Sequence, residues 1–258
     1  MATITIDGRR IEVPGSTTVL QVARSAGVDI PTLCHHEALG PYGACRLCVV
    51  EAEGPTLRRS LVTSCTLPAS DGLTVVTTSP TVQRARRMVL ELLLGRSPGS
   101  ERLRALARRH GVESTRFGEG ASEDDCVRCG LCVRACRDSI GRSAISFAGR
   151  GQKRHVTAEF GKLSELCVGC GTCAAVCPTG AIQLEDRDGE RTIFLKGLAL
   201  AKLELSTCAT CGAPAGTKAF RDHVASRTRD LPQVEEDACC PECARLRRAP
   251  SMAVELPA

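Results

Sequence analysis

The sequence predicts an α+β protein built from four small modules rather than around one large core. Three observations lead to this expectation: a hairpin signal near the N-terminus, a cysteine run that occurs twice, and 17 cysteines gathered in four groups. Small modules without large cores need staples, and bound metals serve as well as disulfides. The expected modules are a β-grasp domain over residues 1–80, a helical segment over 81–120, a domain formed by the repeat over 121–190 and a cysteine-rich tail over 191–258.

The composition argues against nucleic-acid binding. There is no Trp, one Tyr and five Phe, so the chain has few aromatic platforms on which bases could stack. The formal charge is +5, but metal centres held by four thiolates each are net negative. Four such centres would bring the loaded protein to about −3, because a bound metal's own charge must be counted.

The cysteine usage indicates a cytoplasmic metal-binding protein. The start, MATITIDGRRIEV, has no apolar run behind its charges, and no stretch of about 18 apolar residues follows. Without an export signal, cysteines are expected to hold metals rather than form disulfides. We therefore expect a cytoplasmic protein without a transmembrane segment, associated with a membrane only through its partners.

The order of the predicted elements over residues 1–80 is that of a β-grasp. TITI and RRIEV flank Asp7-Gly8, a strong two-residue hairpin signal. The segment TTVLQVARSAGV has helical spacing, with Ser16 or Thr17 to cap its start and Gly27 to cap its end. Three further strands are expected in CRLCVVEAE, SLVTSC and LTVVTT.

Residues 81–120 predict two amphipathic helices. PTVQRARRMVLELLLG forms the first, and SPGSERLRALARRHGV the second, which ends at Gly111. The expected apolar side of the first helix consists of Val82, Met88, Val89, Leu92 and Leu93. Many arginines lie between Arg84 and Arg109, which is typical of solvated helix faces; a docking surface for an acidic partner is the alternative.

The repeat carries the most specific signal in the chain. CVRCGLCVRAC begins at residue 126 and CVGCGTCAAVC at residue 167, both spaced C-x2-C-x2-C-x3-C. In bacterial-type ferredoxins this run binds 4Fe-4S clusters, and its fourth cysteine ligates the other run's cluster. The spacing thus predicts one cluster on Cys126, Cys129, Cys132 and Cys177, and another on Cys167, Cys170, Cys173 and Cys136. Zinc and disulfides are the alternatives, and neither accounts for so specific a spacing.

Two details of the repeat bear on its loops. Gly130 and Gly171 stand where turns of this kind often need a positive φ. Pro178 turns the chain after the second run, whereas Arg137 takes that place in the first.

The first cysteine group predicts a 2Fe-2S cluster. Its members, on the predicted β-grasp, are Cys34, Cys45, Cys48 and Cys65. Plant-type ferredoxins have a similar C-x2-C and a distant fourth ligand, although the first gap here is longer. Gly40, Gly43 and Ala44 keep the loop small. His35 and His36 suggest a Rieske centre, but four cysteines already complete the site, so both histidines are interpreted as supporting or surface groups; zinc is the alternative metal.

The last group predicts a structural zinc site in a zinc-ribbon-like tail. Cys208, Cys211, Cys240 and Cys243 form two C-x2-C knuckles. Cys239 is the odd one out, although it could replace Cys240. A third 4Fe-4S cluster is the alternative, because four thiolates suit both metals.

The motifs of catalysis and nucleotide binding do not occur in the sequence. It contains no G-x-G-x-x-G, no G-x4-G-K-S/T and no nucleophile with a base nearby. Iron-sulfur clusters move one electron each. A chain of such clusters without a substrate pocket is expected to conduct electrons and to be non-catalytic by itself.

The cysteine-rich segments resemble a known family. PTLCHHEALGPYGACRLCVVE is similar to the 2Fe-2S loop of the large iron-sulfur subunit of respiratory complex I and of the small diaphorase subunit of NAD-linked nickel-iron hydrogenases. CVRCGLCVRACRDSIGRSAISFAGRGQKRHV and CVGCGTCAAVCPTGAI continue the resemblance, which covers about residues 1–185. NAD-linked formate dehydrogenases and iron-only hydrogenases carry similar N-terminal modules.

The resemblance implies an electron-transfer subunit. It would relay electrons between a flavoprotein that oxidises NAD(H) and a hydrogenase-like catalytic subunit. A formate dehydrogenase-like or complex I-like NADH dehydrogenase assembly is the alternative within this class. An iron-sulfur redox sensor, with the arginine-rich helices as its output, is the alternative from another class.

The sequence departs from the family at one cluster. Family members bind a further 4Fe-4S cluster through one histidine and three cysteines near the helices, but no cysteine lies between Cys65 and Cys126 here, and His110 alone cannot hold a cluster. We therefore expect one 2Fe-2S cluster, two 4Fe-4S clusters and one zinc ion. Either the arginine-rich helices bring the two cluster domains close enough for a direct electron step, or the 2Fe-2S domain is a side branch.

Overall fold

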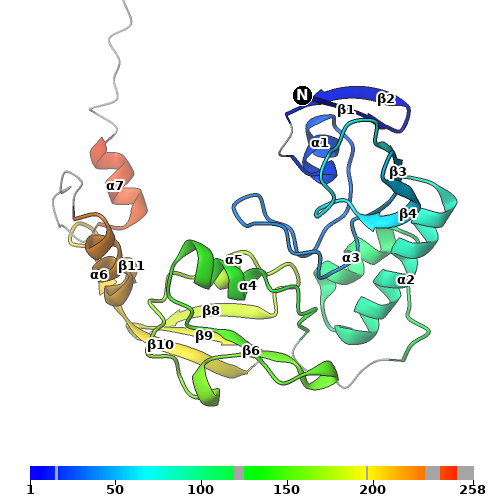
Figure 1. Ribbon diagram of the computed structural model, residues 1–258. Helices are drawn as coiled ribbons and strands as arrows, with labels where there is room; N and C mark the ends of the chain where they lie inside the picture. The colour runs from blue at the N-terminus through cyan, green and yellow to red at the C-terminus, as the bar shows by residue number, and fades with distance from the viewer. Residues whose placement is uncertain (15–16, 119–124, 196, 230–238, 249–258) are drawn as a thin grey trace, which may run out of the picture.

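The computed structural model describes residues 1–14, 17–118, 125–195, 197–229 and 239–248. A five-stranded sheet, two long helices, a second sheet beneath two short helices, and the tail follow one another across the molecule (Figure 1). Within these ranges, no helix combines the length and the apolar character needed to span a bilayer.

The N-terminal sheet has the strand order β2-β1-β5-β3-β4, with β1 parallel to β5. The turn between the first two strands confirms the hairpin prediction, since Asp7 and Gly8 both have positive φ, as a type I′ turn requires. The strands are β1 (Ala2–Ile6), β2 (Arg9–Val13), β3 (Val49–Gly54), β4 (Leu57–Thr63) and β5 (Thr74–Val76).

Helix α1 (Val19–Ser25) packs on this sheet, and its start differs from the prediction. Thr18 is the N-cap: its hydroxyl accepts from the Gln21 N–H, and the Gln21 side chain accepts from the Thr18 N–H at 2.9 Å. The reciprocal bond to Gln21 satisfies two backbone donors and outcompetes Thr17, whose hydroxyl donates to the Pro14 carbonyl instead. Ser16 lies outside the described residues.

The two predicted helices of the arginine-rich segment are α2 (Pro80–Arg96) and α3 (Glu101–Arg109). Ser79 and Ser100 cap their starts through side-chain oxygens. Gly111, with φ of +71°, follows the end of α3, as predicted.

The predicted apolar side of α2 is wrong in part. Met88 and Leu92 are 46% and 49% exposed, whereas Leu90 and Leu94 are buried. Arg86 is also buried, because its guanidinium donates to the Val49 carbonyl at 2.9 Å. The buried stripe therefore includes a charged residue that hydropathy alone assigns to solvent.

The repeat forms two short helices with matching starts. Helix α4 (Leu131–Arg134) begins after Gly130 and α5 (Thr172–Ala175) after Gly171, whose φ values are +76° and +75°. The predicted positive φ is confirmed at both glycines. Short elements complete this region: the π-helical turn η1 (Ala135–Ser139), β6 (Ser146–Ala148), η2 (Gly151–Lys153), β7 (His155–Thr157) and η3 (Glu159–Gly161).

A second, four-stranded sheet connects the repeat to the tail. Its order is β11-β10-β9-β8, so it continues across residue 190. The strands are β8 (Ile182–Arg187), β9 (Glu190–Leu195), β10 (Leu198–Thr207) and β11 (Pro214–Thr217), followed by helices α6 (Lys218–Arg227) and α7 (Pro241–Arg248). The first strands of the tail thus extend the sheet on which the repeat packs.

One cluster of buried side chains, here called the shared core, joins three parts of the chain. Its leucines from α2 and α3 pack against residues of the first cysteine group and of the first repeat run. Each fully buried leucine stabilises this junction by roughly 1.5–3 kcal/mol. The members are Leu33, Cys34, Leu39, Cys45, Leu47, Leu90, Leu94, Leu103, Ala107, Val112, Val127, Cys129, Leu131 and Ala135.

Candidate metal centres

The four cysteines of the first group meet in one buried place. Cys34, Cys45, Cys48 and Cys65 are each at most 6% exposed. Hydrogen bonds from the Cys45 and Cys65 thiols lower the pKa of Cys34 to about 2, and the Cys65 thiol lowers the pKa of Cys48 to about 6. The same hydrogen bonds raise the pKa of their donors, Cys45 and Cys65. Two thiols of the set therefore ionise readily, the other two would ionise only beside a cation, and the thiolate is the form that coordinates a metal.

Local backbone structure explains why these sulfurs converge. Cys48 precedes β3 and Cys65 follows β4, and the antiparallel pairing of the two strands sets those ends side by side. Ser64 ties them together, since its N–H and its hydroxyl both donate to the Cys48 carbonyl, at 3.1 and 2.8 Å. From the preceding loop, the Cys45 N–H donates to Cys34 Sγ at 3.4 Å.

The two histidines beside the first group have other surroundings. His36 is exposed, and its Nδ1 accepts the Ala38 N–H at 3.2 Å. Both ring nitrogens of His35 are buried without a hydrogen-bond partner among the described residues. Desolvation, followed by the charge of Arg24, lowers the pKa of His35, so this ring is neutral at pH 7.

A cavity brings the second run together with the last cysteine of the first. Its lining includes the side chains of Cys136, Cys167, Cys170 and Cys173. Burial raises the pKa of Cys173 to about 12, and the neighbouring charges that raise it further are those of Cys170, Cys167 and Cys136. Two backbone N–H groups point at sulfurs of this set: Gly169 to Cys167 at 3.4 Å, and Ala144 to Cys136 at 3.3 Å.

The first run lies in turn beside Cys177. Burial raises the pKa of Cys129 to about 12, with Cys126 and Cys177 as the charged neighbours that add most to it. Burial also raises the pKa of Cys132. The Arg128 N–H donates to Cys126 Sγ at 3.4 Å. The geometry therefore associates each run with the fourth cysteine of the other.

Arg134 links the first run to the loop of the first cysteine group, a contact that the sequence did not lead us to expect. This residue of α4 is only 5% exposed, and its guanidinium donates to the backbone carbonyls of Cys34, at 3.2 Å, and Gly40. It also lies over the Tyr42 ring, 4.9 Å from the ring centre. A signal was available, because the second copy of the repeat has Ala175 at the equivalent position.

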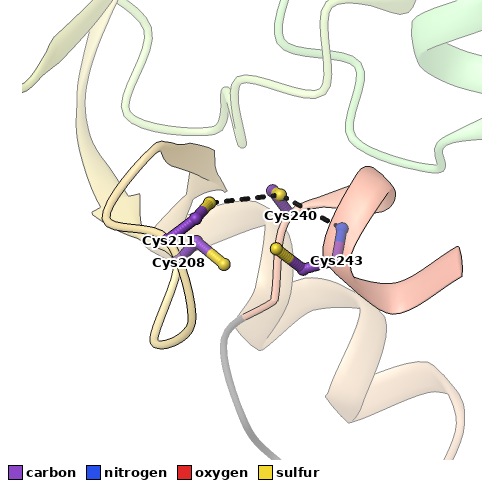
Figure 2. Close-up of side chains that lie close together, drawn as sticks. All are labelled: Cys208, Cys211, Cys240 and Cys243. Carbon is purple, nitrogen blue, oxygen red and sulfur yellow. Dashed lines mark hydrogen bonds between the residues drawn. The ribbon is translucent and has the colours of Figure 1, made fainter. Parts of the chain in front are cut away.

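The last cysteine group converges as predicted from its two knuckles. Four sulfur atoms lie within 4.8 Å of one another, those of Cys208, Cys211, Cys240 and Cys243 (Figure 2). Cys208 and Cys211 stand in the turn between β10 and β11, and the other two at the start of α7. Backbone N–H groups, those of Cys240 and Cys211 first, lower the pKa of Cys208 to about 5.

The spacing of these sulfurs fits a single ion. Tetrahedral zinc with Zn–S bonds of about 2.3 Å places its sulfurs about 3.8 Å apart. Cys211 Sγ lies 3.7 Å from Cys240 Sγ. A cubane would need a wider set, because its irons and sulfides separate the cysteines. Cys239 is not a member of this compact set, and its sulfur lies 3.5 Å from the hydroxyl of Thr210, in the turn between Cys208 and Cys211.

Comparison with known families identifies the class of protein. Residues 1–80 match the 2Fe-2S iron-sulfur cluster binding domain, and residues 121–184 match the 4Fe-4S dicluster domain. The chain is thus an iron-sulfur protein that combines a 2Fe-2S cluster binding domain with a 4Fe-4S dicluster domain.

Curated relatives of the chain are much longer proteins. It is 37% identical over 212 residues to the NADP-reducing hydrogenase subunit HndD of Solidesulfovibrio fructosivorans, covering 70% of this chain and 36% of that one. It is 33% identical over 207 residues to a subunit of the NADH-quinone oxidoreductase of Rhizobium meliloti, covering 70% of this chain and 24% of that one. The chain therefore spans about a quarter to a third of the length of these relatives.

A solved structure matches almost along its whole length. A chain in the crystal structure of an NAD+-reducing [NiFe]-hydrogenase in the H2-reduced state is 31% identical, with a TM-score of 0.60. The match covers 88% of this chain and 98% of that chain. The protein belongs to the family of iron-sulfur electron-transfer subunits found in NAD-linked hydrogenases and complex I-type oxidoreductases.

Arg134→Met is expected to weaken the junction between the 2Fe-2S domain and the repeat. It keeps the side-chain volume but leaves the carbonyls of Cys34 and Gly40 without their donor. The loss at the buried Cys34 carbonyl costs about 1–3 kcal/mol, whereas the exposed Gly40 can bond to water instead. Thermal unfolding of the cluster-loaded chain, followed by visible circular dichroism, should show a lower midpoint.

Arg137→Met is the matched control for that substitution. Its side chain is 60% exposed and pairs with Asp138 on the surface, so the change should stay within about 0.5 kcal/mol. Equal midpoints for the two variants would contradict a structural role for the Arg134 contacts.

Proposed function

We propose that the chain relays electrons between a flavoprotein subunit that exchanges them with NAD(H) and a hydrogenase-like catalytic subunit. The observation that carries this proposal is the shared core, in which Cys34 and Cys45 of the first group and Cys129 of the first run pack with the same leucines of α2 and α3. Bound iron-sulfur clusters would supply one-electron redox chemistry, and the chain's own residues fix their ligands and surroundings.

The 2Fe-2S cluster is assigned to Cys34, Cys45, Cys48 and Cys65. Support comes from the burial of all four side chains and from the hydrogen bonds among their thiols. An all-sulfur donor set is what iron-sulfur clusters require. The surroundings of the two neighbouring histidines give no support for a Rieske centre.

The two 4Fe-4S clusters are assigned to crossed sets of cysteines. One set is Cys126, Cys129, Cys132 and Cys177, and the other is Cys167, Cys170, Cys173 and Cys136. The cavity lined by all four members of the second set supports this exchange. The backbone N–H groups directed at sulfurs of both sets are of the kind that stabilises bound clusters.

A direct electron step between the 2Fe-2S domain and the repeat is favoured over a side branch. Arg134 of the first run bonds to the carbonyl of Cys34 itself, so the two ligand sets are separated by a single buried side chain and its neighbours. Leu90 and Leu103 of the arginine-rich helices pack beneath this junction. The family's cluster with one histidine and three cysteines is then not needed for this step.

A complex I-like NADH dehydrogenase remains the second candidate assembly. The 33% identity to a protein named for NADH-quinone oxidoreductase favours it, whereas the nearly full-length structural match favours a hydrogenase. Identification by mass of the proteins that co-purify with the chain from native cells would separate the two.

The tail is assigned one zinc ion on Cys208, Cys211, Cys240 and Cys243. Their compact arrangement supports a single ion rather than a third cubane. A closed site with four thiolates is typical of structural zinc, which adds folding energy and needs no open coordination position.

Cys136→Ser tests the crossed assignment. We expect it to damage the cluster held mainly by the second run, with a loss of up to about four irons, because it removes that cluster's fourth ligand. Iron analysis and EPR of the reduced chain measure the loss. Cys177→Ser is the reciprocal control and should damage the first run's cluster. Loss of only the first run's cluster in Cys136→Ser would contradict the assignment.

Metal analysis of the full chain tests the zinc assignment. We expect one zinc per chain, lost in Cys243→Ser because a structural site with three thiolates binds zinc far more weakly. Cys239→Ser is the matched control and should retain the zinc, since this side chain contacts Thr210 instead. Four additional irons in place of zinc would establish the alternative.

The relay function is tested with NADH. The chain alone should not be reduced by NADH, and it should become reducible once its flavoprotein partner is added. In the assembled complex, Cys48→Ser should reduce turnover to background if electrons take the direct step. Turnover near normal would identify the 2Fe-2S domain as a side branch. Reduction of the isolated chain by NADH would contradict the proposal that a separate flavoprotein subunit oxidises NADH.

A further inference from the structure

Helix α6 of the tail touches both backbone segments that carry the second cubane set. At its N-terminus, Thr217 contacts the loop between Cys167 and Cys170. Further along, His223 contacts Ile140, shortly after Cys136. One helix thus bridges the two parts of the chain that must stay together to hold the same cluster.

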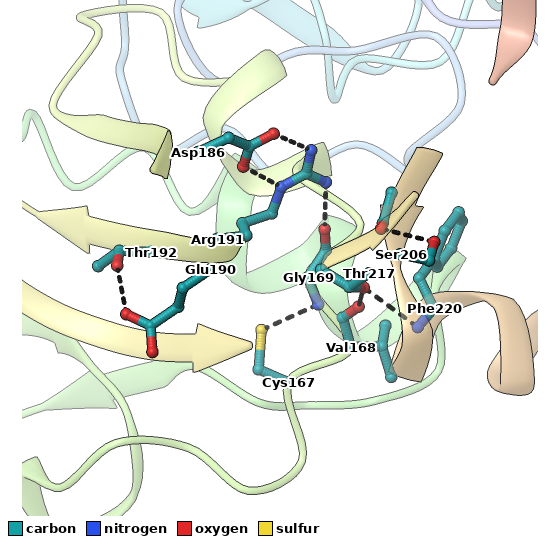
Figure 3. Close-up of polar contacts among 11 residues, drawn as sticks. Cys167, Val168, Gly169, Asp186, Glu190, Arg191, Thr192, Ser206, Thr217 and Phe220 are labelled. Atoms are coloured by element: carbon teal, nitrogen blue, oxygen red, sulfur yellow. Dashed lines mark hydrogen bonds and ion pairs between the residues drawn. The ribbon is translucent and has the colours of Figure 1, made fainter. Parts of the chain in front are cut away.

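Thr217 is the buried centre of this contact. Its side chain is fully buried, and its hydroxyl donates to the Val168 carbonyl while accepting the Phe220 N–H at 3.2 Å (Figure 3). The same hydroxyl therefore caps α6 and holds the cluster loop. Losing it would leave a buried carbonyl unpaired.

The bond from Thr217 controls the direction of a second one. The Val168 carbonyl and the Gly169 N–H belong to one planar peptide, so fixing the oxygen also fixes the N–H on the opposite side. That N–H points at Cys167 Sγ, 3.4 Å away. On the next peptide, the Gly169 carbonyl accepts from Arg191 at 2.8 Å. The loop is therefore held by side chains on both sides.

Close packing reinforces this geometry. Gly169 has φ of +70°, and a Cβ at this position would lie 2.6 Å from the Thr217 methyl carbon. Only glycine can occupy the position without displacing the threonine. The threonine methyl thus lies directly against the cluster loop, and β11 and α6 cannot shift without moving the loop.

The second contact of α6 acts on the segment after Cys136. His223 Nε2 lies 3.0 Å from the Ile140 carbonyl, and since a carbonyl only accepts, Nε2 carries the proton. The guanidinium of Arg227 packs at Gly141, where a Cβ would lie 3.1 Å from it. Nearby, the Ala144 N–H donates to Cys136 Sγ.

The tail's cysteine set lies in the same structural unit. Cys208 and Cys211 form the turn of the β10–β11 hairpin, and β11 ends at Thr217. The Cys208 N–H donates to the Ala213 carbonyl at 2.7 Å, which closes this turn. A metal at the turn would therefore hold the hairpin whose other end places Thr217.

We propose that the tail is a positioning element for the cluster of the second run, with Thr217 as the residue that aims the Gly169 N–H at Cys167 and thereby raises that cluster's reduction potential. This inference rests on the proposed function, because it assumes a 4Fe-4S cluster on Cys136, Cys167, Cys170 and Cys173. On reduction the cluster gains one electron, and no bond forms or breaks. The added negative charge strengthens an N–H···S bond, so the bond favours the reduced form.

Thr217→Val tests the proposal in the full, cluster-loaded chain. It keeps the shape and the charge but removes the hydroxyl, so the second cluster should become harder to reduce. We expect the oxidised-to-reduced ratio at fixed potential to rise by up to about tenfold, equivalent to a downward shift of about 59 mV. EPR-monitored titration with dithionite measures it, and the first run's cluster provides an internal control.

Two further variants separate positioning from simple damage. Thr217→Ser restores the hydroxyl and should recover the wild-type potential. Thr192→Val makes the same chemical change on β9, where the hydroxyl bonds to Glu190, and should have no effect. An unchanged second-cluster potential in Thr217→Val, with full iron content, would overturn the proposal.

If the Thr217→Val chain fails to retain iron, the His223→Ala variant is used to test the proposal instead. His223 is half-buried, and its substitution removes the contact between α6 and the Ile140 carbonyl. A chelator should then remove iron faster from the second run's cluster, whereas the first run's cluster should lose iron at the wild-type rate. Equal loss rates in variant and wild type would overturn the proposal. Failure of the proposed function is distinguishable, since a wild-type chain would then lack the second cluster before any substitution is made.

Discussion

The convergence of thiols in small buried loops is the constraint on which the rest of the structure depends. Several cysteine sulfurs in one desolvated place cannot all ionise without a cation, as the raised pKa values of Cys129 and Cys173 show. A metal resolves this conflict and contributes folding energy at the same time. The short elements around each set, such as α4 and α5, need no large core of their own because the bound centre would replace one.

The contacts around Arg134 join the 2Fe-2S domain to the first copy of the repeat. The shared core packs leucines around Cys34, Cys45 and Cys129, and the guanidinium donates to the carbonyls of the buried Cys34 and of Gly40. Burying a guanidinium is costly unless it is fully engaged, and stacking on Tyr42 completes its surroundings. No cysteine lies between Cys65 and Cys126, and the Arg134 side chain joins the shared core in connecting the 2Fe-2S domain to the repeat.

The sequence predicted those parts of the structure whose determinants are local. The Asp7-Gly8 turn and the positive φ of Gly130 follow from turn chemistry, and cysteine spacing was enough to expect the compact tail set. The prediction from the sequence was wrong where long-range contacts determine which side chains are buried. The Arg86 guanidinium is buried where it donates to the Val49 carbonyl of β3, and Met88 is 46% exposed although its hydropathy predicts burial.

The tail shows the same limit at a larger scale. Its composition suggested a separate module, but the sheet continues through β9 and β10 without regard to the repeat's boundary. The local sequence pattern of β8 and β9 does not reveal that these strands pair with each other across the predicted domain boundary. The contact of Thr217 with the Val168 carbonyl depends on that pairing, so no feature of the sequence near either residue could have indicated it.

The two copies of the repeat have consequently acquired different neighbours. The first copy faces the 2Fe-2S loop through Arg134, where the second has Ala175, and the second copy faces the tail through Gly169. Identical ligand spacing fixes the kind of cluster, whereas hydrogen bonds and burial around the sulfurs fix its potential. Two clusters of one type, made by one repeated run, can therefore be tuned apart by an arginine on one side and a threonine on the other. Such a difference would decide which of the two clusters holds an electron for more of the time, whereas the direction of net flow follows from the donor and acceptor at the two ends of the relay.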